Sequence, residues 1–307
     1  MIRRRQNRGV ALITALLIMA LVTTLTYSLE WDNSLDLRRT IVMLNRDQAV
    51  QVALGAESWI QSILRQDLEE SDVDHLGELW ASELPGLPID GGDVFGDIDD
   101  LQGRFNLNNL IGEDGSIDEP SLEYFRRLLQ TLGIDPRFAG IAADWLDADQ
   151  DAQFPDGAED SMYSGLLPPY RTANQIISTA SEIAALEGID KASIDLLLPH
   201  ITALPGRTGI NVNTATSPVL QALDENLTAA DVERLVAERA DAGFVDLAGA
   251  FSSVVTPEVL NQLEEVTNFF QLKVIVRIDT VRITYYSILE RGPRGDVTPI
   301  LRSLGTT

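Results

Sequence analysis

The stretch VALITALLIMALVTTLTYSL, residues 10–29, decides how the rest of this chain is placed. It carries no charged residue, and its length is what an α-helix needs to cross the hydrocarbon core of a bilayer. A basic leader precedes it, with Arg3, Arg4, Arg5 and Arg8. Because basic residues stay on the cytoplasmic side of an inserted helix, we expect everything after Glu30 to lie on the other side of the membrane.

Two ordinary explanations of this segment compete with a special role. A cleaved secretory signal would have a shorter apolar region followed by a small-residue cleavage site, and neither is present. A plain, uncleaved membrane anchor agrees with the composition. The distinguishing feature is Gly9, which stands between the basic leader and the apolar run.

The segment Arg8-Gly-Val-Ala-Leu-Ile-Thr14 resembles the leader of the type IV pilin superfamily. That resemblance implies cleavage between Gly9 and Val10 by the prepilin peptidase, and methylation of the new terminus. Most members of the superfamily have Glu at the fifth mature position, where this chain has Thr14. A carboxylate buried in a fibre needs a partner, which in this superfamily is the terminal amine of the subunit above. The minor pseudopilin K family of type II secretion typically lacks this Glu, so Thr14 favours that family.

Composition restricts the chemistry that the chain can perform. Its net charge of −24 at pH 7 repels phosphate backbones, so we expect no nucleic acid partner. The sequence has no Cys and only two His, which excludes Cys-based zinc sites, Cys nucleophiles and His-rich metal sites. Carboxylates are the main functional groups that remain for chemistry. The chain is long enough for one large or two medium domains beyond the anchor.

Periodicity predicts the elements that follow the membrane span. Apolar residues recur at helical spacing from Ala49 to Leu64, so we expect one unbroken helix from Val10 to about Leu68. Residues 69–96 contain two prolines and a Gly-Gly pair, which predicts an irregular connection. Residues 98–107 read as a strand interrupted by Gly103.

Residues 111–265 read as almost wholly helical. The predicted helices occupy residues 122–132, 136–146, 193–198, 218–223, 229–240 and 257–265, with a capping box at 179–182. Two short segments, Arg104-Phe-Asn-Leu-Asn-Asn-Leu110 and Gly209-Ile-Asn-Val-Asn-Thr-Ala215, repeat an Asn-x-Asn turn that leads into helical sequence. This echo suggests two small helical units in tandem.

The last stretch alternates apolar and polar residues, as half-buried strands do, at residues 270–278, 281–289 and 297–301. The fold class is therefore α+β: a long N-terminal helix with a pilin-like antiparallel sheet, interrupted by an all-helical domain of two SAM-like units. The expected division of the chain is a leader at 1–9, a membrane helix at 10–29, pilin-like parts at 30–110 and 266–307, and the helical insert at 111–265.

An acidic loop at residues 144–163 concentrates the candidate metal ligands. Asp147, Asp149 and Asp151 alternate, so their side chains can converge on one cation, and calcium takes six to eight oxygen ligands of this kind. The loop is not a regular EF-hand, because Ala152 and Ala158 occupy positions that an EF-hand gives to Gly and Glu. A plain solvated acidic loop is the alternative. The candidate ligands are Asp144, Asp147, Asp149, Asp151, Glu159 and Asp160.

Most of the chain is similar to the minor pseudopilin K family, through the leader, Gly103-Arg-Phe-Asn-Leu-Asn-Asn109, the acidic loop and the strand tail. The resemblance implies a subunit at the tip of the periplasmic pseudopilus, anchored in the inner membrane by one helix with its bulk in the periplasm. It also implies the minor pseudopilins I and J as partners, a role in starting assembly for export of folded proteins across the outer membrane, and one or two structural calcium ions.

Other classes of function remain as alternatives. One is an ordinary membrane-anchored periplasmic binding protein with a calcium-stabilised helical domain. Another is DNA binding, because residues 204–215 resemble a helix-hairpin-helix module, although the acidic surroundings lack the basic residues that such binding needs. We expect no enzyme activity, because no nucleophile stands beside a base and His200 reads as a packed residue.

Overall fold

The first and longest element is a single helix. The computed structural model describes residues 8–82, 84–239 and 242–305. Helix α1 runs unbroken over Arg8–Glu70, which is about 95 Å at the standard rise per residue. Before Ala49 it is almost wholly exposed, and it contains a segment long and apolar enough to cross a membrane. The predicted continuous helix is confirmed.

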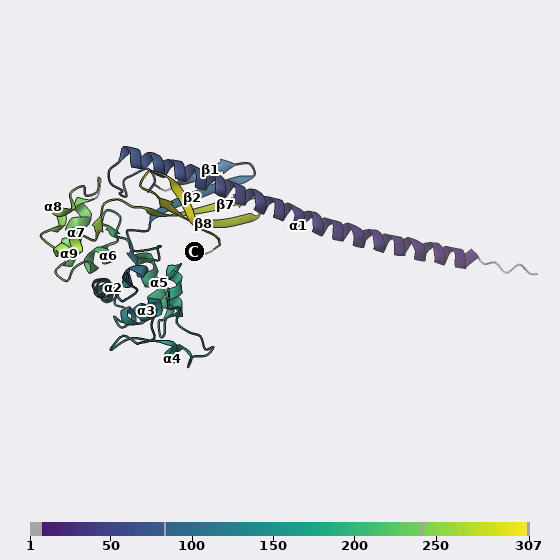
Figure 1. The fold of residues 1–307 in the computed structure, drawn as a ribbon. Coiled ribbons are helices and arrows are strands. Elements are labelled where there is room, and N and C mark those ends of the chain that lie inside the picture. The colour runs from purple at the N-terminus through teal and green to yellow at the C-terminus, as the bar shows by residue number, and fades with distance from the viewer. Residues whose placement is uncertain (1–7, 83, 240–241, 306–307) are drawn as a thin grey trace, which may run out of the picture.

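The second half of α1 packs on a sheet (Figure 1). Five strands form this sheet in the order β1-β2-β7-β8-β9, and every neighbouring pair is antiparallel. The strands are β1 (Leu84–Ile89), β2 (Gly92–Asp100), β7 (Phe269–Ile278), β8 (Val281–Arg291) and β9 (Val297–Leu304). One apolar core joins the buried face of α1 to the sheet, and it includes Ala53, Ile60, Leu64, Leu272 and Val274. The three predicted C-terminal strands are confirmed, each one to three residues longer than expected.

The region after α1 differs from the prediction. The expected irregular connection at 69–96 instead contains β1 and the start of β2. Pro85 and Pro88 fit into β1 because it is an edge strand, where a missing backbone N–H is tolerated. Gly91, at φ +80°, makes the tight turn between these strands. The expected strand at 98–107 is also displaced. The chain leaves β2 after Asp100, and only Phe105–Asn106 forms a further short strand, β3.

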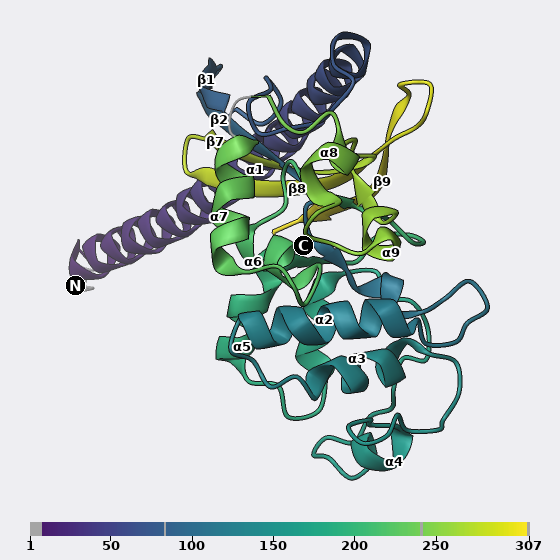
Figure 2. The same ribbon diagram turned by 90° about the vertical axis from the view of Figure 1, so that its left-hand side faces the viewer.

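Between β2 and β7 the chain builds a mainly helical body (Figure 2). Its helices are η1 (Leu107–Leu110), α2 (Glu119–Thr131), α3 (Phe138–Leu146), α4 (Asp160–Tyr163), η2 (Ala180–Ala185), α5 (Lys191–Leu197), η3 (Leu198–His200), α6 (Ser217–Ala222), α7 (Ala229–Glu238), α8 (Leu247–Phe251) and α9 (Pro257–Leu260). Figure 2 shows α7, α8 and α9 beside the sheet, α2, α3 and α5 farther out, and α4 at the far edge. This body has its own apolar core.

The prediction of an almost wholly helical block is only partly right. Residues 147–159 and 164–179 are irregular. The helix expected at 257–265 ends at Leu260, because β6 (Leu263–Glu264) pairs in parallel with β5 (Ile210–Asn211). The end of the helix expected at 229–240 lies outside the described residues.

The two Asn-x-Asn turns have matching structures. In each, the first Asn accepts a hydrogen bond from the backbone N–H two residues later, from Asn108 to Asn106 and from Asn213 to Asn211. The second Asn then holds a distant backbone segment through both ends of its amide: Asn108 binds the N–H and C=O of Ile177, and Asn213 binds those of Phe244. Each turn follows a two-residue parallel bridge, β3 with β4 (Ile201–Thr202) and β5 with β6.

Candidate metal centre

Three of the predicted ligands converge where α3 ends and α4 begins. Asp144 lies in the last turn of α3, Asp147 follows its C-terminus, and Glu159 precedes α4. One carboxylate oxygen from each lies within 4.8 Å of the others. The three side chains come together because the loop 148–158 returns on itself, and Gly157 permits the close return. A Cβ at Gly157 would stand 2.1 Å from Oδ2 of Asp144.

These carboxylates are removed from solvent, although nothing in the described chain neutralises them. Asp144 is 0% exposed, and Asp147 and Glu159 are each 4% exposed. Asp144 accepts the N–H of Gln153 at 3.0 Å. Oδ1 of Asp147 and Oε1 of Glu159 have no hydrogen-bond partner among the residues that the structure describes. Unpartnered buried carboxylate oxygens are costly. As hard donors they suit a calcium-type cation, so the donor set passes this test of fit.

Burial and mutual repulsion raise the pKa of each group. Burial raises the pKa of Asp144, against the N–H groups of Gln153 and Ala158. Burial, then the charges of Asp149 and Asp144, raise the pKa of Asp147 to about 6. For Glu159, burial and the charges of Asp144 and Asp147 raise the pKa to about 7. Without a cation, the folded loop therefore holds protons near neutral pH that the unfolded chain releases.

The other three predicted ligands do not join this group of oxygens. Asp149 and Asp151 are exposed, and Asp149 accepts the N–H of Asp151 at 2.7 Å. Asp160 faces Thr172, whose N–H and hydroxyl both donate to its Oδ1 at 3.0 Å. Asp149 remains near Asp144 and Asp147, since its charge helps to raise the pKa of both.

Asn174 belongs to the same neighbourhood and was not among the predicted ligands. Its N–H donates to the C=O of Trp145 at 3.0 Å, and its Nδ2 donates to the C=O of Asp149 at 2.7 Å. Its buried Oδ1 has no partner within the described part of the chain. The backbone of Asn174 is left-handed, at φ +45°, a conformation that Asn tolerates better than most residues. The sequence alone does not show which Asn adopts it.

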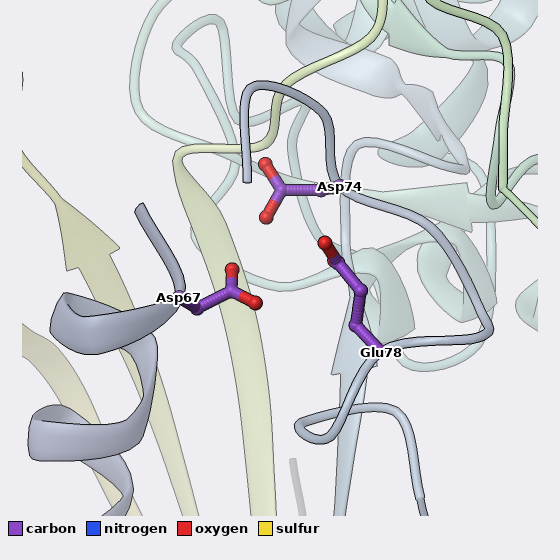
Figure 3. A group of neighbouring side chains, drawn as sticks. All are labelled: Asp67, Asp74 and Glu78. Carbon is purple, nitrogen blue, oxygen red and sulfur yellow. The ribbon is translucent and has the colours of Figure 1, made fainter. Parts of the chain in front are cut away.

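A second group of acidic side chains lies near the end of α1 and was not predicted at all. Asp67, Asp74 and Glu78 also bring carboxylate oxygens within 4.8 Å of one another (Figure 3). Their spacing in the sequence matches no cation-binding pattern, and the first is on a helix whereas the others are in the loop that follows.

The remaining candidate positions take structural roles. Gly9 and Val10, the predicted processing site, lie in the first turn of α1. Thr14 donates its hydroxyl to the C=O of Ala11 at 3.0 Å. In the segment that resembles a DNA-binding hairpin, Asn211 and Asn213 are buried. Nδ1 of His200 hydrogen-bonds the hydroxyl of Thr216 at 2.8 Å, and burial lowers the pKa of this His.

Comparison with known families is consistent across the chain. Two family models described as "Type II secretion system (T2SS), protein K" match residues 103–206 and 210–261. The boundary between them falls between the two units that open on the Asn-x-Asn turns, since the second turn begins at Asn211.

Relatives and one solved structure extend the match. "Type II secretion system protein K" of Pseudomonas aeruginosa is 36% identical over 98% of this chain and 94% of its own. The protein of that name from Klebsiella pneumoniae is 34% identical over 80% of this chain and 79% of its own. The fold matches a chain in the crystal structure of the GspK-GspI-GspJ complex from the type 2 secretion system of enterotoxigenic Escherichia coli. The TM-score is 0.77 at 24% identity, over 88% of this chain and all of that one.

Proposed function

Because this chain belongs to the type II secretion system protein K family, we propose that it caps the periplasmic pseudopilus of that system as its terminal minor pseudopilin. Members of this family are structural components of the type II secretion system. The apolar N-terminal helix of this chain suits an anchor in the inner membrane. The proposal assigns the chain a role in assembly rather than in catalysis, with its N-terminus cytoplasmic and its bulk periplasmic.

The observation that carries the proposal is the position of the helical body relative to α1. Figure 1 shows α1 projecting from one side of the molecule, with the sheet and helices gathered at its opposite end. Helical pilus subunits assemble by packing such helices side by side, where burial against sister helices replaces lipid. The exposed half of α1 is free for this packing. The helical body, inserted between β2 and β7, would obstruct a subunit stacked above.

Thr14 supports the same position. A subunit inside the fibre would present a carboxylate at this depth to the amine of the subunit above it. The hydroxyl of Thr14 is instead satisfied within its own helix, by the C=O of Ala11. At the top of the fibre, where no subunit above supplies an amine, a subunit with Thr at this position leaves no buried carboxylate without a partner.

The partners follow from the structural neighbour. That neighbour is a chain of a GspK-GspI-GspJ complex, so we propose the I and J minor pseudopilins of the same secretion system as the partners of this chain. The full-length chain, co-expressed with its I and J pseudopilins and purified from detergent-extracted membranes, should carry both. Immunogold labelling should place it at one end of each pseudopilus. Label distributed along the fibres would overturn the proposal.

We also propose that Asp144, Asp147 and Glu159 hold a structural calcium ion, with Asn174 beside them. The support is their burial, their convergence within 4.8 Å and their unpartnered oxygens. Calcium would supply the positive charge that these side chains lack and would hold the loop 148–158 between α3 and α4. The proposal is for one or two calcium ions at this loop.

A thermal unfolding experiment tests the ion. A ligand at a hundredfold excess over its dissociation constant stabilises the folded state by about 2.7 kcal/mol. We expect calcium to raise the Tm of the full-length protein relative to chelator, and Asp147→Asn to remove most of that gain. Asp195→Asn, which alters only a surface pair with Lys191, should keep the gain. Identical unfolding curves in calcium and in chelator would rule out this ion.

A further inference from the structure

A second acidic cluster, formed by Asp67, Asp74 and Glu78, lies at the end of α1, apart in the sequence from the acidic loop. Asp67 is in the last turn of α1, and Asp74 and Glu78 are in the loop between α1 and β1. Figure 3 shows the three carboxyl groups turned toward one another. One oxygen from each lies within 4.8 Å of the others.

Arg291, at the end of β8, neutralises only part of this charge. Its Nη1 lies 3.1 Å from Oδ2 of Asp67, and its Nη2 donates to Oδ2 of Asp74. Nδ1 of His75 accepts the N–H of Gly77 at 3.1 Å, and Nε2 of His75 lies 3.9 Å from Oε1 of Glu78. When all three carboxyl groups are ionised, they exceed the one guanidinium by two negative charges.

Glu78 supplies an independent sign that something is bound between these groups. Its side chain is 9% exposed. Its Oε2 accepts the indole N–H of Trp80 at 2.7 Å and the backbone N–H of His75 at 3.0 Å. Its Oε1 is buried without a hydrogen-bond partner in the described chain, and Nε2 of His75, at 3.9 Å, is too distant to serve. A buried carboxylate oxygen in this state calls for a partner, which can be a cation, a proton or a buried water.

We propose that Asp67, Asp74 and Glu78 bind a divalent cation of the calcium type. Such an ion balances the two excess negative charges of the ionised cluster and provides a partner for Oε1 of Glu78, and hard carboxylate oxygens are the ligands it prefers. Arg291 contacts only the Oδ2 atom of each aspartate. This site is separate from the acidic loop, because its ligands come from α1 and the following loop.

The position of the site suggests what the ion does. Oδ2 of Asp74 accepts the N–H of Thr267 at 2.6 Å, and the C=O of Asp74 accepts Nδ2 of Asn211 at 3.1 Å. The ion would therefore connect the end of α1 both to the sheet and to the helical body. Its loss would loosen the attachment of the body to the long helix.

Metal counting on the full-length protein in detergent tests the site. After chelation and dialysis against calcium, the wild type should carry at least one equivalent that Glu78→Gln loses. Glu69→Gln, an exposed substitution in the same last turn of α1, should lose none. Asp147→Asn should lose only the ion of the acidic loop, so failure of either site is distinguishable from failure of the other.

Terbium luminescence provides a test that needs no ligand variant. Trp80 contacts Glu78 directly, so it should sensitise terbium bound at this site, whereas Trp145, next to Asp144, should sensitise terbium in the acidic loop. We expect Trp80→Phe and Trp145→Phe each to remove a separate component of the emission, and calcium to displace both. Unchanged emission in Trp80→Phe, or undiminished calcium in folded Glu78→Gln, would overturn the proposal.

Discussion

Glu57 is a carboxylate buried on the face of α1 that packs against the sheet. It is 2% exposed. Its Oε2 accepts the hydroxyls of Tyr285 at 2.6 Å and Ser287 at 2.7 Å, and Arg302 donates to both of its oxygens. Burial acts to raise the pKa of Glu57, but the hydrogen bonds and charge of Arg302, with the two hydroxyls, outweigh it and hold the pKa below 4.5. This carboxylate therefore connects α1 to β8 and β9.

The lowered pKa of Glu57 predicts a pH-dependent contribution to stability. An acid whose pKa is depressed on folding stabilises the protein above its unfolded pKa, and the contribution is lost as the pH falls through the folded pKa. We expect Glu57→Gln to lower the free energy of unfolding by about 2–3 kcal/mol at neutral pH. Measured by urea unfolding, that difference should shrink below pH 4.5. Asp47→Asn, on the exposed part of α1, serves as the control, and a pH-independent difference for Glu57→Gln would contradict this account.

At the scale of the element, α1 joins two environments in one continuous helix. Its first part exposes apolar side chains on every face, as a segment meant for lipid or for sister helices does. From Ala49 onward only one face is apolar, and that face is buried against the sheet. The same helix therefore serves as anchor and as part of the folded domain, and the transition between the two is visible in the periodicity of the sequence.

The start of α1 carries a prediction of its own. If the leader is processed as in related pilins, the chain purified from membranes should begin at Val10 and carry one methyl group, as measured by mass spectrometry. Gly9→Val should leave the leader attached, because the peptidase would no longer find its cleavage site. Val10→Leu, which keeps Gly9, should still be cleaved. A wild-type chain that retains Met1 in secreting cells would show that the helix is an ordinary anchor.

For the whole molecule, a buried polar network joins the sheet to the helical body. Nδ2 of Asn211 donates to Oδ2 of Asp100 at 2.8 Å and to the hydroxyl of Thr267 at 3.0 Å. The hydroxyls of Thr214 and Thr267 also donate to Oδ2 of Asp100, at 2.5 and 2.6 Å. Asp100 ends β2, Thr267 precedes β7, and Asn211 and Thr214 belong to the helical body, so these bonds set the orientation of the two parts.

Removing the central amide should weaken this joint. Each buried group left unpaired costs about 1–3 kcal/mol, so we expect Asn211→Ala to destabilise the protein by about 3 kcal/mol or more. Amide hydrogen exchange should rise at Gln102 and Thr267, while the cores of the sheet and the body stay protected. Asn226→Ala, which breaks only the local bond from Nδ2 of Asn226 to Asp224, is the matched control. Equal effects of the two substitutions would contradict a special role for Asn211.

The sequence by itself determined the features that depend on neighbouring residues. These are the membrane-length helix, the amphipathic continuation from Ala49, the alternating C-terminal strands and the repeated Asn-x-Asn turns. It also identified the acidic loop, because seven carboxylates between Asp144 and Asp160 are conspicuous without any knowledge of the fold. All of these depend on periodicity or local composition, which a single strand or helix already expresses.

Only the tertiary structure decided which side chains meet. It separated Asp144, Asp147 and Glu159 from the exposed Asp149 and Asp151, because the loop between α3 and α4 returns on itself, where Trp145 of α3 packs against Tyr163 of α4. It assembled Asp67, Asp74 and Glu78 around Arg291, more than two hundred positions away in the sequence. Periodicity cannot report such convergence, since the distance between two residues in space depends on how whole elements pack and not on their spacing along the chain.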